Sequence, residues 1–170
     1  MKNNIMLAML LILAILLVGC EQKILRPTIP FDPDEMEQAL KPGPYTITGQ
    51  AFAKTQSGEV KYAAGNTIIL LPLTAYIKQA LALQESEDAF TKVQIDKRLL
   101  DKRKEATADG EGRFKFSGLA QGEYYMETKI LWLVSTRYGN IETGGTVKAR
   151  INLTGNFESG NNLNHEVILQ

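Results

Sequence analysis

Hydrophobic and polar residues alternate along most of the chain from Tyr45 onward, which is typical of strands that bury one face. Six or seven such segments are separated by turns rich in Gly, Asn and Asp, such as 109–110 and 139–140. The pattern predicts an all-β domain over residues 45–170, an antiparallel sandwich of about seven strands. The longest inward-facing run comprises Tyr124, Met126, Thr128, Ile130, Trp132 and Val134.

Some apolar residues fall on the opposite, outward face of the predicted strands. Ile69 and Leu71 do so in one strand, and Leu131 and Leu133 do so in the longest one. A solvated outer face would carry polar residues at these positions. Another part of the chain or a partner protein must therefore cover them, and we refer to these four as the outer apolar residues, the candidate interaction surface.

Residues 74–105 interrupt the alternation. They contain neither Gly nor Pro and are rich in Ala, Leu, Gln, Glu and Lys, a composition that favours helix. We expect two helices with a break near residues 85–88, although the second part, 89–95, also alternates like a strand. This helical insertion should fold back over an outer sheet face and cover some of the outer apolar residues. The alternative is that the insertion stands free of the sandwich and binds a partner.

Residues 21–44 hold five of the six prolines of the chain. Proline lacks an amide donor and favours extended backbone before it, so residues 20–44 are predicted to form a semi-rigid tether. A short helix is expected at Asp34–Leu40, with Pro33 near its start. The tether would hold the domain away from a membrane.

The first nineteen residues have the organisation of a secretory signal. Lys2 supplies a positive charge, and 5–18 is an unbroken apolar run of fourteen residues. As a helix the run would be about 21 Å long, which is short for a hydrocarbon core of about 30 Å. The alternative is a short membrane helix that happens to end at a cysteine.

The end of this segment, Leu17, Val18, Gly19 and Cys20, resembles the bacterial lipobox. This resemblance implies cleavage before Cys20 and a lipoprotein anchored through diacylglycerol and palmitate on that residue. Two or three acyl chains together anchor a protein stably, whereas one does so only marginally. Glu21, in place of Asp, resembles the sorting signal for the outer membrane, so we expect a lipid anchor there, facing the periplasm.

The charge balance argues against a polyanionic partner. Lys plus Arg and Asp plus Glu number 19 each, and loss of Lys2 with the signal leaves 18 basic against 19 acidic groups. A nucleic-acid binder would carry a basic surplus, so no nucleic-acid partner is expected. Cys20 is the only cysteine, which excludes an intrachain disulfide.

Neither a metal site nor a catalytic centre is expected. His165 is the single histidine, and protein zinc sites need several His or Cys ligands. It lies in phase with Val167 in the last predicted strand, which indicates a structural role. Asp109, Glu111 and Glu123 could bind Ca²⁺ weakly, but turn chemistry explains Asp109 equally well. We predict no enzyme activity and no cofactor.

The segment 107–124, TADGEGRFKFSGLAQGEY, contains a T-x-D-x-x-G turn, an F-x-F strand and a G-L-x-x-G-x-Y sequence. Together with ITG at 47–49 and AGNTIIL at 64–70, it resembles the carboxypeptidase regulatory-like domain of bacterial envelope proteins. The resemblance implies a transthyretin-like, Ig-like sandwich that carries no peptidase zinc ligands. The insertion departs from the simplest members.

These observations predict a membrane-anchored lipoprotein that acts as a non-catalytic binding or structural module of the cell envelope. We expect it to act through contact with another envelope protein. The alternative is a carbohydrate- or peptidoglycan-binding module, which exposed aromatic residues on a sheet face would favour. Trp132 lies in the inward phase, so a place in the core is weighed against a sugar platform.

Overall fold

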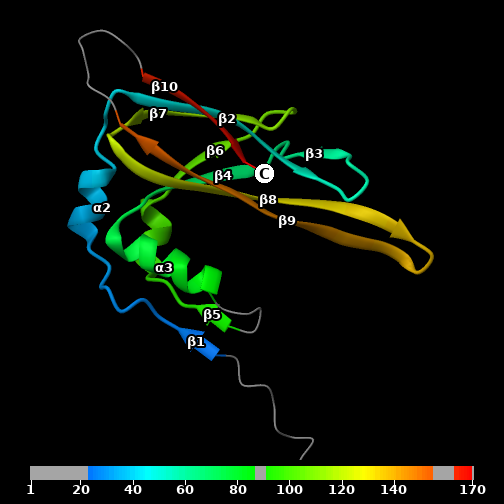
Figure 1. Ribbon diagram of the computed structural model, residues 1–170, viewed down its shortest axis with the longest axis horizontal. Coiled ribbons are helices and arrows are strands. Elements are labelled where there is room, and N and C mark those ends of the chain that lie inside the picture. The colour runs from blue at the N-terminus through cyan, green and yellow to red at the C-terminus, as the bar shows by residue number, and fades with distance from the viewer. Residues whose placement is uncertain (1–22, 87–90, 155–162, 170) are drawn as a thin grey trace, which may run out of the picture.

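The computed structural model describes residues 23–86, 91–154 and 163–169 of the chain. Strands make up most of these residues, with two α-helices and one short 3₁₀ helix (Figure 1). In chain order the elements are β1 (Lys23–Leu25), α2 (Pro33–Ala39), β2 (Tyr45–Lys54), β3 (Val60–Tyr62), β4 (Thr67–Pro72), α3 (Ala75–Ser86), β5 (Thr91–Val93), η1 (Lys97–Lys102), β6 (Lys104–Thr107), β7 (Arg113–Leu119), β8 (Gly122–Thr136), β9 (Gly139–Leu153) and β10 (Leu163–Leu169).

Two four-stranded sheets form a sandwich, which confirms the predicted all-β fold with a small helical insertion. In one sheet β2 pairs with β10, β3 and β7, and the other has the order β6-β4-β8-β9. The pairings within the two sheets are antiparallel except that between β10 and β2, which is parallel. No hairpin joins these two strands along the chain, so nothing in the connection requires them to run in opposite directions.

The main core lies between the two sheets, where the inward-facing residues predicted from the alternation are buried. Ile47, Ile68, Leu70 and Met126 are fully enclosed. The other members of this cluster are Tyr45, Ala51, Ala63, Ala108, Phe114, Phe116, Leu119, Tyr124, Ile130, Val147 and Leu153. Burial of each large apolar side chain contributes about 1.5–3 kcal/mol, so this cluster is the main source of stability.

The T-x-D-x-x-G turn precedes β7 and is built as its residue types require. One carboxylate oxygen of Asp109 accepts hydrogen bonds from the backbone amides of Glu111, at 2.9 Å, and Arg113, at 2.8 Å. The turn places Gly112 against β2, where its carbonyl accepts the amide of Ala51 at 2.9 Å. A local side-chain contact thus sets the turn that brings β7 beside β2.

A second apolar cluster, which we call the helical cluster, covers part of the outer face of the β6-β4-β8-β9 sheet, over β4. It consists of Phe31, Met36, Tyr76, Ile77 and Leu99, from the N-terminal segment, α3 and η1. Leu71 of β4 packs against it.

The predicted tether is wrong for the described residues 23–44, since they pack on the rest of the protein. Met36 is fully buried and Phe31 is nearly so. The predicted short helix is confirmed as α2, with Asp32 as its N-cap. The proline content correctly indicates extended backbone between β1 and α2, but the apolar side chains at 31 and 36 dock this segment on α3 and η1.

The first helix of the insertion is confirmed as α3, whereas the second expected helix is wrong. Instead Thr91–Val93 form β5, which pairs in parallel with β1. Residues 97–102 form the single 3₁₀ helix η1, and Lys104–Thr107 join the sheet as β6. The β-branched alternation at 91–95 favours extended backbone, and a pairing partner in the N-terminal segment satisfies its hydrogen bonds.

Candidate functional site

β8 and β9 form a hairpin whose far half extends beyond the sandwich (Figure 1). The strands pair in unbroken register from Gly122 opposite Leu153 to Thr136 opposite Gly139. The main core ends at Ile130 and Val147, and Trp132 packs against its edge. We call the part beyond this edge, residues 131–146, the arm.

The inner face of the arm borders a cleft at the open end of the sandwich. The opposite wall is the connection between β2 and β3 together with the start of β3. The cavity has a volume of 680 Å³, within the range of about 300–1,000 Å³ that is usual for small-molecule sites. We call it the Trp132 cleft, and its lining residues are Thr55, Gln56, Ser57, Glu59, Lys61, Trp132, Leu133, Val134 and Thr143.

Hydrogen bonds within the β2–β3 connection hold this wall of the cleft in place. The amide of Thr55 donates to the carbonyl of Glu59 at 2.9 Å, and the Thr55 hydroxyl accepts the amide of Glu59 at 3.0 Å. Gly58 adopts a positive φ of 87°, which lets the chain reverse within this short loop. The wall is therefore ordered before any ligand arrives, which lowers the entropic cost of binding.

The strand register sets the chemistry of the cleft. Lys61 lies opposite Ala53, on the inward face of its strand, and forms an ion pair with Glu59. Trp132 lies opposite Thr143, so the indole and a hydroxyl share one face of the arm. An aromatic surface beside a carboxylate, an ammonium, an amide and hydroxyls suits a ligand with apolar C–H faces and many hydroxyl groups.

The carboxylates of the cleft can be compared with those that glycoside hydrolysis requires. Glycoside hydrolysis uses a pair of carboxylates placed on either side of the scissile bond. Among the described residues that line the Trp132 cleft, Glu59 is the sole carboxylate, and Lys61 already pairs with it. The cleft therefore lacks, among these residues, the second carboxylate that such a reaction uses.

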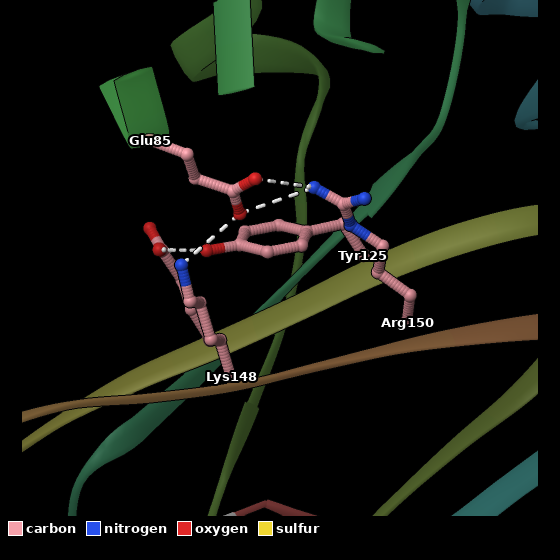
Figure 2. A network of polar contacts seen from close by, with 5 residues as sticks. Glu85, Tyr125, Lys148 and Arg150 are labelled. Atoms are coloured by element: carbon pink, nitrogen blue, oxygen red, sulfur yellow. Dashed lines mark hydrogen bonds and ion pairs between the residues drawn. The ribbon is translucent and has the colours of Figure 1, made fainter. Parts of the chain in front are cut away.

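A separate polar network docks the end of α3 on the outer face of the β8–β9 pair (Figure 2). Glu85 accepts hydrogen bonds from Lys148, at 3.1 Å, and from Arg150, at 3.1 and 3.2 Å. The bond from Lys148, followed by the positive charge of Arg150, lowers the pKa of Glu85.

Tyr125 lies beneath this network. Its hydroxyl donates to Glu127 at 2.8 Å, and burial, followed by this contact, raises its pKa. The network joins helix to sheet, and every charged member has a counterpart. We therefore assign it a structural role.

The structure separates the outer apolar residues into two groups. Leu71 is covered by the helical cluster, and Ile69 is half-buried between Glu105 and Glu127 of the adjacent strands. Leu131 and Leu133, on the arm, are 40% and 66% exposed, and Leu133 also borders the Trp132 cleft. The insertion thus covers the face at Leu71 of β4, as predicted for some of these residues, and leaves the arm open.

The other candidate residues do not form a site. Asp109 caps a turn, Glu111 pairs with Arg113, and Glu123 pairs with Lys78. In the described part of the chain, no group of three or more His, Cys, Asp or Glu side chains could hold a metal ion.

Two further predictions concern the ends of the chain. The backbone of His165 pairs with Ile47 inside β10, as the alternation predicted, but its side chain lies outside what the structure describes. Leu17, Val18, Gly19 and Cys20 also lie outside the described residues. Within those residues, no helix is long and apolar enough to cross a membrane.

Sequence reasoning missed the polar wall of the Trp132 cleft. Gln56, Glu59 and Lys61 read as ordinary polar residues of a turn, because nothing local shows that they face the arm. Trp132 was identified, but with the core and a sugar platform as competing assignments. In the structure Trp132 packs against the edge of the core and also lines the cleft.

No family model and no curated protein matches the chain. A solved structure of a Pseudomonas aeruginosa protein, described as a "putative carbohydrate binding protein", is similar at 25% sequence identity and a TM-score of 0.65. The similarity covers 83% of this chain and 98% of that one. The two proteins therefore share the sandwich fold over most of the length of both chains.

Proposed function

We propose that this protein is a non-catalytic carbohydrate-binding module of the cell envelope, with the Trp132 cleft as its binding site. One observation carries the proposal: Trp132 and the polar residues Glu59 and Lys61 line the same open cavity of 680 Å³. The assignment of the similar Pseudomonas protein to carbohydrate binding supports it. The resemblance to a regulatory-like module supports a role without catalysis.

The lipobox-like residues before Glu21 support the second part of the proposal, a lipoprotein anchored in the outer membrane and facing the periplasm. In that location peptidoglycan is the carbohydrate polymer that an anchored domain can reach. Its glycan strands present both hydroxyl groups and apolar sugar faces, which match the mixed lining of the cleft.

Fluorescence titration tests the cleft directly, because Trp132 is the only tryptophan of the chain. Soluble peptidoglycan fragments and chito-oligosaccharides should change its emission in a saturable manner. Lys61→Ala should weaken the affinity at least about tenfold if the ammonium donates to a sugar hydroxyl in this partly enclosed site.

Two variants control for loss of fold. Trp132→Phe keeps an aromatic ring against the core edge and should lower affinity, measured by calorimetry, while the protein stays folded. Tyr138→Ala at the exposed tip of the arm should leave affinity unchanged. Equal affinity of the wild type, Trp132→Phe and Lys61→Ala for every bound sugar would remove the cleft from the proposal.

Protein contact, the function expected from the sequence, remains a second candidate. A specific observation favours it: Leu131, Leu133, Tyr138 and Ile141 are all exposed on the arm. Single exposed apolar residues are common, but here several lie on both faces of one hairpin, which a partner could enclose. A protein that binds no sugar but loses its envelope partner on Leu131→Ser would favour this function, because Leu131 is exposed on the arm and does not line the cleft.

A further inference from the structure

We propose that the edge formed by β1 and β5 lies against the membrane surface, in contact with phospholipid headgroups. This inference rests on the lipid anchor of the proposed function. Cys20 precedes Lys23 by three residues, and three extended residues span at most about 11 Å. The lipid attachment point is therefore close to β1, whatever conformation the intervening residues adopt.

The short reach matters because the described N-terminal segment is fixed to the protein body. β1 pairs with β5, and the amide of Gln94 donates to the carbonyl of Leu25 at 2.8 Å. Arg26 Nε donates to the Gln94 side chain at 2.8 Å. Residues 21–44, as a free spacer, would have reached about 80 Å. The packing removes nearly all of that length.

Contacts farther along the N-terminal segment hold it on the protein body. The amide of Ile29 donates to the side chain of Gln79 on α3 at 2.8 Å, and Gln79 donates to Thr28 at 2.8 Å. The ring of Phe31 packs edge-on against that of Tyr76, with centroids 5.4 Å apart. The Arg98 guanidinium lies over the Phe31 ring, 4.9 Å from its centroid. These interactions tie the segment to both α3 and η1.

The exposed side chains of this edge suit a headgroup layer. Three large apolar residues are exposed there: Ile24, Ile29 and Ile95. Asp96 pairs with Arg98 and is the one acidic residue within 23–26 and 91–98. Glu21, Glu87 and Asp88 adjoin these stretches in the sequence and lie outside the described residues. The five basic residues of the two stretches are Lys23, Arg26, Lys92, Lys97 and Arg98.

A hollow of 550 Å³ opens between the N-terminal segment and residues 94–98. Arg26, Lys97 and Arg98 line it, together with Asp96, which pairs with Arg98, and with Ile29 and Ile95. Guanidinium and ammonium groups bind phosphate, and apolar side chains favour the adjoining interfacial layer. The chemistry of the edge therefore agrees with the position that the short link to Cys20 imposes.

Site-specific fluorescence quenching in vesicles tests this orientation. Lipid attachment consumes the thiol of Cys20, the only cysteine, so an introduced cysteine is the single free thiol of the lipidated protein. A fluorophore would be placed at Ile24→Cys or Lys92→Cys. Lys115→Cys is the matched control, because it is exposed on β7, at the opposite side of the molecule from β1 (Figure 1).

Nitroxide lipids labelled at the headgroup should quench the probes at 24 and 92 at least about threefold more than the probe at 115. Equal quenching at all three sites would overturn the proposed orientation. A second variant, with twelve Gly and Ser residues inserted before Lys23, should stay anchored while quenching at 24 and 92 falls to the level at 115. Persistent strong quenching there would mean that the edge binds headgroups independently of the short link, and would overturn the role given to that link.

Failure of the anchor gives a different result. A protein that has been cleaved before Cys20 but carries no lipid on it would stay in solution when vesicles are sedimented, and it would show no quenching at any site. Sedimentation, carried out before the quenching measurement, therefore separates failure of the anchor from failure of the orientation.

Discussion

Gly112 lies directly against Ala51, so that a Cβ on Gly112 would come within 2.4 Å of the Ala51 carbonyl oxygen. Gly112 also has a positive φ of 76°, which L-residues with a side chain rarely adopt. The two residues join the T-x-D-x-x-G turn to β2, the first strand of the sandwich. The atom that an added Cβ would meet belongs to the backbone of β2, so it cannot move aside as a flexible side chain could. Glycine is therefore required at this position for two separate reasons.

Gly112→Ala should lower the free energy of unfolding by at least about 2 kcal/mol, since backbone strain and the steric overlap add. Gly110→Ala, two residues earlier in the same turn, is the control. It meets no atom within 4 Å and should change stability by less than about 1 kcal/mol. Urea unfolding of the two variants measures the difference, and equal stabilities would contradict the contact.

Glu85 should make the docking of α3 depend on pH. Its pKa is lowered in the folded protein from the ordinary value of 4.5, so its ion pairs stabilise the fold fully above that value. The contribution is lost as the pH falls through the lowered pKa of the folded state. Glu85→Gln should therefore reduce thermal stability at neutral pH, and the difference from the wild type should vanish at strongly acidic pH.

The control for this experiment is Ser86→Ala at the end of the same helix, which removes no titratable group and should show no such pH-dependent difference. A Glu85→Gln variant whose stability difference from the wild type is the same at every pH would contradict the ion-pair assignment. Scanning calorimetry over a pH series measures both variants.

Met36→Ala should destabilise the protein by about 2–5 kcal/mol, because it leaves a cavity in the helical cluster. Gln38→Ala, an exposed change in the same helix, is the control and should be nearly neutral. If residues 23–44 were only a spacer, neither substitution would alter unfolding of the sandwich.

The two groups of outer apolar residues should respond differently to a polar substitution. Leu71→Ser removes an apolar side chain that packs on the helical cluster and should cost at least about 1 kcal/mol. Leu133→Ser should cost less than about 0.5 kcal/mol, because Leu133 is 66% exposed. The denaturant midpoints of the two variants measure these losses of stability. Equal losses would mean that Leu71 and Leu133 have the same environment.

Cys20→Ala should abolish labelling of the protein with palmitate and leave an uncleaved precursor. The reason is that the thiol is the acceptor of the diacylglyceryl group in the proposed lipobox. Ser86→Ala, a remote and exposed change, should be labelled normally. Labelling of Cys20→Ala at the level of the wild type would show that the anchor is not on this residue.

The sequence alone determined the local elements. Alternation at 45–53, 67–71 and 124–130 predicted strands and their inward faces, because each strand buries one side in a shared core. The Ala- and Leu-rich stretch predicted α3, and Pro33 with Asp34 predicted α2. Asp109 marked a turn through contacts with residues at most four positions away. All of these depend on interactions between near neighbours in the chain.

The tertiary structure decided which of these elements meet. β5 is extended because it finds β1, whose residues lie 68 positions earlier in the chain. Phe31 and Met36 dock on α3, and this turns a proline-rich spacer into a packed segment. Glu59 and Lys61 face Trp132 because a short hairpin in one sheet lies across from a long hairpin in the other. Such contacts depend on how two sheets are stacked, and the energy that selects the stacking comes from burial of the whole core. No short stretch of residues carries that information.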